Sequence, residues 1–323
     1  MLKKRVSQYL GIAGISFLVS SCITPPVVER TETRTVPARY YDAQDTTNTV
    51  RLKWQEFFTD PDLNGLINTA LNNNQELNIT LQEIQIANSE IRTRKGKYLP
   101  FVGIRGGAGV EKVGRYTNIG ASEATTDIAP ETETPEPLPD YTVSAFASWE
   151  VDIWRKMRNA KKAAVSRYLA SMEGKNFLVT NLVAEIATSY YELLALDSQL
   201  DIVKHNIEIQ QNALDIVRME KAAARVTELA VRRFEAQVLS TRSLQYTIQQ
   251  RIIETENRTN FLVGRYPQPI QRNFQTFTTL VPSTIGAGIP SQLLANRPDI
   301  KQAELELLAA KLDVKSARAN FYP

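Results

Sequence analysis

Apolar residues recur at helical spacing over residues 61–97. Steps of three and four positions put these residues on one side of a helix. They are Leu63, Leu66, Ile67, Ala70, Leu71, Leu77, Leu81, Ile84, Ala87 and Ile91. Three consecutive asparagines, 72–74, predict a break into a short helix and a longer one. The pattern ends at Leu99-Pro100, because proline lacks the N–H that continues a helix and disfavours helix for the residue before it.

Beyond Pro100 the pattern changes from a helical period to a period of two. Residues 141–151 alternate between a mostly polar side and an apolar side formed by Tyr141, Val143, Ala145, Ala147, Trp149 and Val151. This alternation predicts a strand over 141–153 with one apolar face. The glycine-rich segment 101–116 has no helical face and is interpreted as a second strand. Each strand is long enough to cross an outer membrane, which takes about 9–11 tilted residues.

The segment between the two strands, residues 117–140, has six acidic residues, four prolines and no basic residue. This composition is typical of a solvated loop, as found at the extracellular tip of a membrane hairpin.

A very long helical region covers residues 154–263. Residues 154–223 contain no proline and a single glycine, and about 70 helical residues would extend on the order of 100 Å, more than a compact domain needs. The apolar steps of three, four and seven form a heptad pattern: Val165, Leu169, Met172, Val179, Val183, Ile186, Tyr190, Leu193, Leu196, Leu200, Val203, Ile207, Leu214 and Val217. A second apolar row includes Leu182, Tyr191 and Leu194 and predicts neighbours on two sides, as in a closed ring of helices. The pattern breaks at 222–227, and a second helix is expected over 228–263, closed by Gly264.

The C-terminal residues repeat the beginning of this architecture. When Pro323 is set against Pro100, Phe321-Tyr322-Pro323 aligns with Tyr98-Leu99-Pro100, and the apolar positions of the preceding helices coincide. We therefore interpret 54–264 as a first repeat, 265–292 as a connection and 293–323 as an incomplete second repeat.

The N-terminus has the layout of a bacterial lipoprotein signal. A basic start at Lys3 to Arg5 precedes a short apolar core and the sequence Val19-Ser20-Ser21-Cys22. Residues 1–21 are predicted to be removed, and Cys22 to carry a covalent lipid. Ile23, in place of aspartate, favours sorting to the outer membrane. Residues 22–53 lack a periodic apolar face and are interpreted as an extended tether.

Composition excludes several other classes of function. The chain has 38 basic and 35 acidic residues, which gives no reason to expect nucleic acid as a partner. The single histidine, His205, lies among charged residues and is expected to be solvated, and no metal-ligand set accompanies it. The glycines of 103–109 lack the spacing and the Gly-Lys-Ser/Thr of a phosphate loop. No catalytic residues, cofactor or metal site is predicted, so we expect that the protein is not an enzyme.

Several motifs together resemble the outer membrane efflux protein family, the TolC-like outer membrane factors. They are Tyr98-Leu99-Pro100, residues 148–154 (SWEVDIW), residues 261–267 (FLVGRYP) and residues 293–300 (LLANRPDI). The lipobox, Val19-Ser20-Ser21-Cys22, resembles that of the lipoprotein branch of this family, which serves RND-type multidrug efflux.

The resemblance implies a mainly α fold with a membrane β-hairpin. Each protomer would supply long helices to an α-barrel and strands to a trimeric, twelve-stranded outer-membrane β-barrel that extends into the periplasm. The implied partners are two further copies, a periplasmic adaptor, an inner-membrane RND-type pump and outer-membrane lipid.

Two departures from the family pattern concern the junctions of the long helices. The family usually has Phe-Gly or a similar pair where this chain has Ile153-Trp154-Arg155. It often has glycine at the turn between the long helices, where residues 222–226 read Ala-Ala-Ala-Arg-Val.

The expected function is a passive exit duct for drugs or other small molecules. The second strand pair is missing from the sequence, which suggests C-terminal truncation, and unpaired strand edges in lipid cost several kcal/mol per backbone group. A non-functional fragment of the channel, and a periplasmic lipoprotein scaffold or adaptor built on a coiled coil, therefore remain alternatives. A scaffold, however, has no use for two alternating strands.

Overall fold

The computed structural model describes residues 36–37, 53–274, 277 and 289–322. The elements of these ranges are, in chain order, α2 (Trp54–Phe57), α3 (Pro61–Asn73), α4 (Gln75–Lys97), β1 (Phe101–Glu111), α5 (Asn118–Glu123), β2 (Asp127–Ala129), β3 (Thr132–Glu133), β4 (Leu138–Ser148), α6 (Lys156–Ala222), α7 (Glu228–Val263), α8 (Pro290–Asn296) and α9 (Pro298–Ala319). The fold is mainly α-helical, as predicted. The chain forms two compact units: one comprises the described residues of 89–164 and 311–322, and the other those of 26–88 and 165–310.

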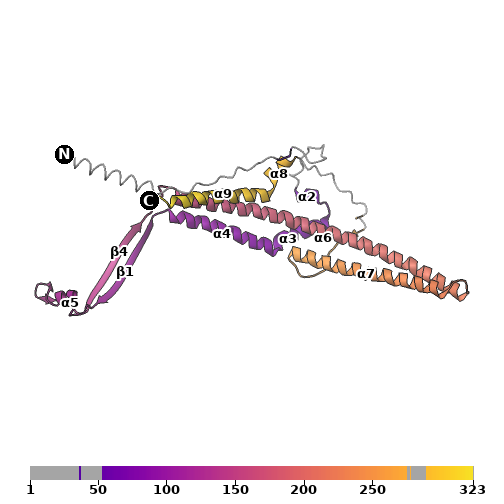
Figure 1. Ribbon diagram of the computed structural model, residues 1–323, viewed down its shortest axis with the longest axis horizontal. Coiled ribbons are helices and arrows are strands. Elements are labelled where there is room, and N and C mark those ends of the chain that lie inside the picture. Colours follow the sequence, from indigo (N-terminus) through magenta and orange to yellow (C-terminus); the bar gives the residue numbers. More distant parts are fainter. Residues whose placement is uncertain (1–35, 38–52, 275–276, 278–288, 323) are drawn as a thin grey trace, which may run out of the picture. The chain divides into compact units, whose positions relative to one another are not determined.

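The second unit is organised around the long helices α6 and α7, which run side by side in opposite directions and meet at a turn (Figure 1). Helix α3 packs against them, and the three helices share one hydrophobic core. Its most deeply buried members are Leu63, Ile67, Ile186, Tyr190, Leu193, Leu194 and Val263. Toward the turn the core thins to Leu214, Val231 and Val238. The heptad positions predicted for α6 between Val179 and Val217 all belong to these two clusters or pack against them.

The start of α3 is fixed by a side-chain cap. The Asp60 carboxylate accepts hydrogen bonds from the backbone N–H groups of Asp62 at 2.9 Å and Leu63 at 3.4 Å, and Pro61 occupies the first helical position. The buried Tyr190 hydroxyl of α6 donates to the same carboxylate at 2.8 Å. Burial raises the pKa of the Tyr190 phenol, and the hydrogen bond to Asp60 adds to this effect. The N-cap of α3 is thus also bound by a side chain of α6.

The predicted break at the three asparagines is confirmed, and Asn74 explains it. Its side-chain oxygen accepts from the Leu77 N–H at 2.9 Å at the start of α4, while its amide nitrogen donates to the Leu262 carbonyl at 2.8 Å. Asn74 therefore caps α4 and ties the α3–α4 joint to the end of α7.

The first unit contains an antiparallel hairpin of β1 and β4. The two strands lie side by side (Figure 1). The register pairs Phe101 with Ser148 at one end and Glu111 with Leu138 at the other, without a bulge. The predicted loop 117–140 is not wholly irregular, because it holds the short helix α5 and the small pair β2–β3, and β4 begins within it.

The predicted strand bounds need correction. The first strand ends at Glu111 and not at 116, and the second covers Leu138–Ser148 and not 141–153. Trp149 and Val151, expected on the apolar strand face, lie outside the strand. The chain leaves the ladder there because the Trp149 indole N–H donates to the Tyr98 carbonyl at 3.1 Å and the Ile153 N–H closes a tight turn on the Val151 carbonyl at 2.9 Å.

Helix α6 starts at Lys156, and Asp152 caps it. The Asp152 carboxylate accepts from the backbone N–H groups of Met157 at 3.0 Å and Arg158 at 2.9 Å. None of the helices that the structure describes is apolar over a stretch long enough to cross a bilayer.

Candidate functional site

The β1–β4 register separates the hairpin into two chemically different faces, because paired residues lie on the same side of a sheet. One face is apolar except for the hydroxyl of Tyr141: Val102, Ile104, Gly106, Ala108, Val110, Pro139, Tyr141, Val143, Ala145 and Ala147. The other carries Phe101, Gly103, Arg105, Gly107, Gly109, Glu111, Leu138, Asp140, Thr142, Ser144, Phe146 and Ser148. The charged and hydroxyl side chains of both strands are confined to this second face, apart from the phenol of Tyr141.

The apolar face is uncovered. Ile104 is 81% exposed, Tyr141 79% and Val143 87%, and within the described chain β1 and β4 pair only with each other. Exposed apolar surface of this extent is unfavourable in water and marks a contact with lipid or protein. The outer edge of each strand also offers backbone groups that need partners.

One glycine of β1 makes room for an aromatic ring on the polar face. A Cβ at Gly103 would come within 2.6 Å of the Phe146 ring, which lies directly across the ladder. Phe101 adds a second ring, with its centroid 6.0 Å from that of Phe146. A Cβ placed at Gly106, Gly107 or Gly109 would meet no atom within 4 Å, so the space around these three positions would tolerate a side chain.

The base of the hairpin is joined to helix ends by two tryptophans. Trp149 donates to the carbonyl of Tyr98, where α4 runs into β1. Trp154 stacks on Tyr322 after the end of α9, with ring centroids 4.8 Å apart. The Ser316 hydroxyl of α9 also donates to the Lys156 carbonyl at 2.8 Å. The segment between β4 and α6 thus contacts the residues that follow α4 and those that follow α9, the two helices that correspond to each other in the internal repeat.

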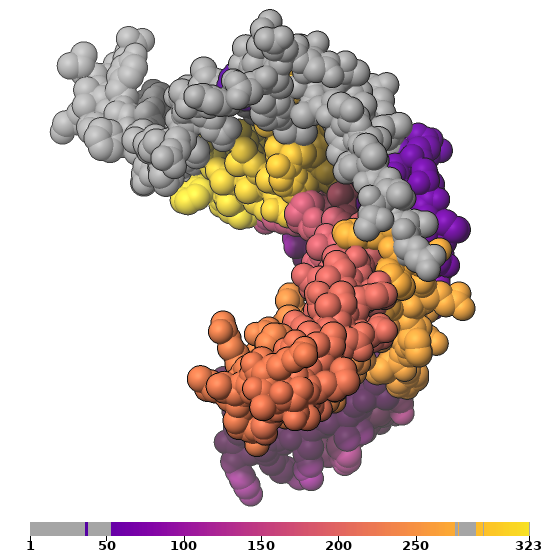
Figure 2. Space-filling model, turned by 90° about the vertical axis from the view of Figure 1, so that its right-hand side faces the viewer, coloured from indigo at the N-terminus to yellow at the C-terminus, as the bar shows by residue number. Residues whose placement is uncertain are grey.

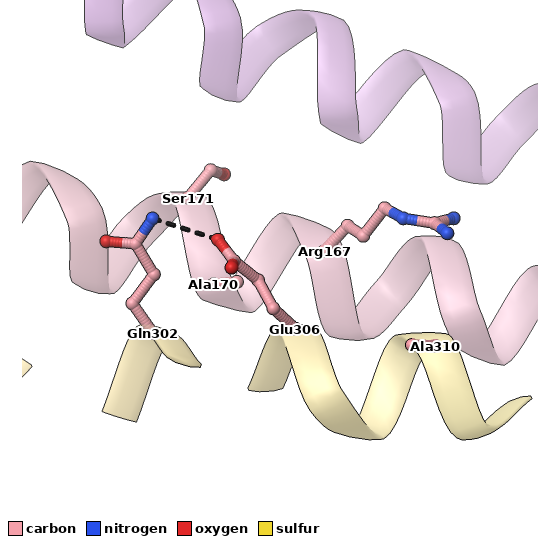
Figure 3. Close-up of a pocket in the computed structure, with 6 residues that line it drawn as sticks. All are labelled: Arg167, Ala170, Ser171, Gln302, Glu306 and Ala310. Atoms are coloured by element: carbon pink, nitrogen blue, oxygen red, sulfur yellow. Dashed lines mark hydrogen bonds between the residues drawn. The ribbon is translucent and has the colours of Figure 1, made fainter. Parts of the chain in front are cut away.

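Helices α6 and α9 also pack closely within the second unit. Figure 3 shows Gln302 and Glu306 of α9 beside Ala170 and Ser171 of α6, around an open cavity of about 370 Å³. The Gln302 amide donates to Glu306 at 3.0 Å. Gly174 permits this approach, because a Cβ there would lie 3.0 Å from the Gln302 side-chain oxygen.

The α6–α7 hairpin carries two exposed apolar rows that the sequence analysis missed. One follows the heptad on α6 and the other follows it on α7: Ile202, Ile209, Ile216, and Leu239, Tyr246, Ile253. Each of the six is more than half exposed. The spacing of seven residues in each row is visible in the sequence. On α6, however, the neighbouring residues Val203, Leu214 and Val217 already account for one packed side of the helix, so the exposed row beside them was not recognised. A helix with apolar rows on two sides needs two neighbours.

The model of the outer membrane efflux protein family matches residues 66–265, more than half of the chain. The chain belongs to this family. Membership in this family places the protein in the outer membrane.

Curated relatives of this chain include two proteins that are named for export. The pyoverdine export outer membrane protein OpmQ of Pseudomonas aeruginosa is 30% identical over 271 residues, which are 84% of this chain and 56% of OpmQ. The cation efflux system protein CusC of Escherichia coli K12 is 27% identical over 84% of this chain and 55% of CusC. The chain spans about half the length of these relatives.

Solved structures give the same fold. A crystal structure of CusC superposes with a TM-score of 0.74 at 24% identity and covers 91% of this chain and 63% of that one. The open state of the MtrE outer membrane channel of Neisseria gonorrhoeae gives 0.73 at 22% identity, over 92% and 63%.

Both departures from the family pattern coincide with strained backbone. Arg155 has φ 59° and Ala224 has φ 57°, in the left-handed region that favours glycine. Arg155 stands at the strand-to-helix junction, and Ala224 at the turn between α6 and α7, which faces the viewer in Figure 2. The sequence identified the two positions, and the structure supplies the physical reason why glycine would suit them.

We expect Ala224→Gly to raise the free energy of unfolding by about 1 kcal/mol, because glycine adopts φ 57° without the steric cost that alanine has. Thermal unfolding followed by far-UV circular dichroism measures the change. Ala223→Gly is the matched control: Ala223 has no positive φ, so glycine there should lower the stability or leave it unchanged. Equal shifts in the two variants would contradict the assignment of strain to Ala224.

Cys22, predicted to carry the lipid, lies outside the described residues, as do the signal at 1–21 and most of the tether. His205 is solvated, as expected: its side chain is 69% exposed, and a hydrogen bond with the Asp201 carbonyl, together with the Asp201 charge, raises its pKa. Among the described residues no cluster of histidine and carboxylate side chains has the geometry of a metal site.

Proposed function

We propose that this chain is a subunit of an outer-membrane efflux channel, a passive exit duct for drugs or other small molecules, and not an enzyme. The observation that carries the proposal is the β1–β4 hairpin, in which one whole face is apolar and exposed. Lipid would cover this face, and the polar face would line water, which is the alternation of outer-membrane strands. A coiled-coil scaffold in the periplasm would have to leave the same face in water.

The exposed heptad rows on α6 and α7 support an assembly in which each helical hairpin has helical neighbours on both sides. We propose a homotrimer whose helices close an α-barrel across the periplasm and whose strands contribute to a twelve-stranded barrel. A periplasmic adaptor and an inner-membrane RND-type pump would supply the substrate. OpmQ and CusC are named for the export of pyoverdine and of cations, which are small solutes of the kind that a duct passes without chemistry.

We further propose that a lipid on Cys22 anchors the mature N-terminus in the outer membrane. Because Cys22 is the single cysteine of the chain, this modification also provides a clean background for thiol chemistry: a lipidated Cys22 has no free thiol.

The hairpin is tested by cysteines on neighbouring residues of opposite faces. We expect Thr142→Cys, on the polar face, to react with a membrane-impermeant maleimide in isolated outer membranes. We expect Val143→Cys, on the apolar face, to remain unlabelled there and to react once detergent and denaturant remove the lipid. The two positions are adjacent in β4 and both are exposed in the isolated chain, so only the membrane distinguishes them.

The parent chain, with Cys22 alone, sets the background of this labelling. Equal labelling of both variants in membranes would overturn the proposed channel and would favour the periplasmic scaffold. Labelling of the parent chain would instead overturn the lipid on Cys22 and leave the hairpin assignment intact.

A further inference from the structure

The base of the β1–β4 hairpin collects an unusual concentration of positive charge. Three segments of the first unit meet there: the end of α4 (89–97), the start of α6 with the residues before it (150–162), and the end of α9 (311–319). They hold twelve basic and four acidic residues, whereas the whole chain is nearly balanced at 38 and 35. The opposite end of the same hairpin, 117–140, is acidic and has no basic residue. The charge is therefore polarised along the hairpin.

The basic residues of these segments outnumber the carboxylates three to one. The ion pairs within the basic segments include Arg94 with Glu90 at 2.6 Å, Lys156 with Glu150 at 3.7 Å, and Arg158 with Asp152 at 3.7 Å. Further basic side chains are exposed there: Arg92, Lys95, Lys97, Lys162, Lys311 and Lys315. We call these helix ends, with their twelve basic residues, the basic collar.

The basic collar contains a cavity. Arg94 and Lys97 of α4 and Lys156 of α6 line it together with Glu150, Met157, Ala160 and Ser316, and its volume is about 380 Å³. Three cations face one carboxylate around this space, and the other lining side chains are small or apolar. A cavity of this size and sign accommodates a phosphate group and the adjoining polar atoms of a headgroup.

Aromatic side chains separate the basic collar from the apolar face of the hairpin. Phe101 is 63% exposed and Trp149 62%, and Trp154, Phe321 and Tyr322 are also exposed. Along the first unit the order is thus apolar strands, aromatic side chains and then cations. Aromatic residues concentrate at the level of membrane headgroups, and clustered Lys and Arg beside them attract anionic lipid.

We propose that the basic collar binds the phosphate of an anionic phospholipid, of the phosphatidylglycerol type, in the leaflet that contacts the base of the hairpin. The proposal rests on the proposed function, since it needs the hairpin to lie in the membrane. Lys97 and Lys156 hold the phosphate in the cavity, and Trp149 and Trp154 pack beside the glycerol region.

The test uses brominated lipids, which quench nearby tryptophan. The chain is reconstituted in phosphatidylcholine bilayers that contain a fixed fraction of phosphatidylglycerol, and either one lipid or the other is brominated. Two of the three tryptophans, Trp149 and Trp154, lie beside the basic collar. We expect the relative binding constant for phosphatidylglycerol over phosphatidylcholine to be about five-fold and to fall as salt is added.

Lys97→Gln combined with Lys156→Gln should reduce this preference to near unity. Lys204→Gln combined with Arg233→Gln removes the same charge from exposed positions on α6 and α7 of the second unit and should leave the preference unchanged. Circular dichroism of both double variants confirms that the helices are retained. Inorganic phosphate, compared with chloride at equal ionic strength, should not compete.

Four outcomes would overturn the lipid site. The first two are equal quenching by both brominated lipids in the parent chain and an unchanged preference for phosphatidylglycerol in the Lys97/Lys156 variant. The third is an equal loss of this preference in both double variants. The fourth is loss of the preference when inorganic phosphate is added, which would indicate a site for the free anion. Absence of quenching by either lipid is different, because it shows that the hairpin base is not in the bilayer, and it refutes the proposed function along with the lipid site.

Discussion

Arg272→Ala is expected to lower the free energy of unfolding by about 3 kcal/mol, the size of effect seen when one partner of a buried ion pair is removed. The Arg272 guanidinium, 11% exposed, donates to both carboxylate oxygens of Asp197 at 2.5 and 3.1 Å and to Glu256 at 2.6 Å. It also donates to the Ile270 carbonyl at 3.0 Å. Burial alone would lower the pKa of Arg272, but the hydrogen bonds with Asp197 and Glu256 raise it above its ordinary value. Without this cation two half-buried carboxylates face each other on α6 and α7.

Denaturant unfolding of the full chain measures this loss, and two variants make the result specific. Arg232→Ala removes an arginine that also pairs with two carboxylates, Glu228 and Glu235, but is 68% exposed. Because exposed pairs contribute little, we expect a change below about 1 kcal/mol. Arg272→Lys keeps the charge without the planar fork and should fall between the two. A loss at Arg272 no larger than that at Arg232 would show that the buried cluster does not stabilise the fold.

Gly264→Ala is expected to destabilise the chain by more than about 2 kcal/mol, because it combines two penalties. Gly264 ends α7 with φ 75°, which alanine adopts only at a cost. An added Cβ would also lie 2.5 Å from the carbonyl oxygen of Asn73 and 2.8 Å from its carbon, both backbone atoms that cannot rotate away. The end of α7 would have to move off the α3–α4 joint.

The matched control for this glycine lies in α3. Gly65 is exposed in mid-helix, and nothing lies within 4 Å of a Cβ placed there. Gly65→Ala should therefore stabilise the chain by about 0.5–1 kcal/mol, through helix propensity alone. Thermal midpoints that move in opposite directions for the two variants are the expected result. A harmless Gly264→Ala would show that the α7 cap and the Asn73 contact are not needed.

The helices and their joints could be predicted from the sequence because local signals determine them. The steps of three and four, the asparagines around Asn74, and Gly264 followed by Pro267 each act within a few residues of the boundary they mark. The strand ends could not be placed in this way. Trp149 continues the alternation of β4, but its indole N–H is engaged by Tyr98, which is distant in sequence, so a tertiary contact overrides the pattern.

The surfaces were harder to predict than the elements. Only the register shows that Val102, Ile104 and Val110 share a face with Val143, because glycines dilute the alternation in β1. Arg272 was missed for a different reason: the connection 265–292 has no periodic pattern, and nothing local indicates that one of its residues reaches back to Asp197. The basic collar was missed because its charges belong to three segments far apart in the sequence.

The glycines of β1 also affect the tendency of the hairpin to aggregate before it is in contact with lipid. Four of its eleven residues, Gly103, Gly106, Gly107 and Gly109, present little side chain and have low strand propensity. A strand of this kind pairs weakly with stray chains, even though its partner β4 is rich in residues that favour strands. We therefore expect the glycines to limit aggregation of the chain before it enters the membrane, when no lipid covers the apolar face and no neighbouring strand pairs with the outer edges of the hairpin.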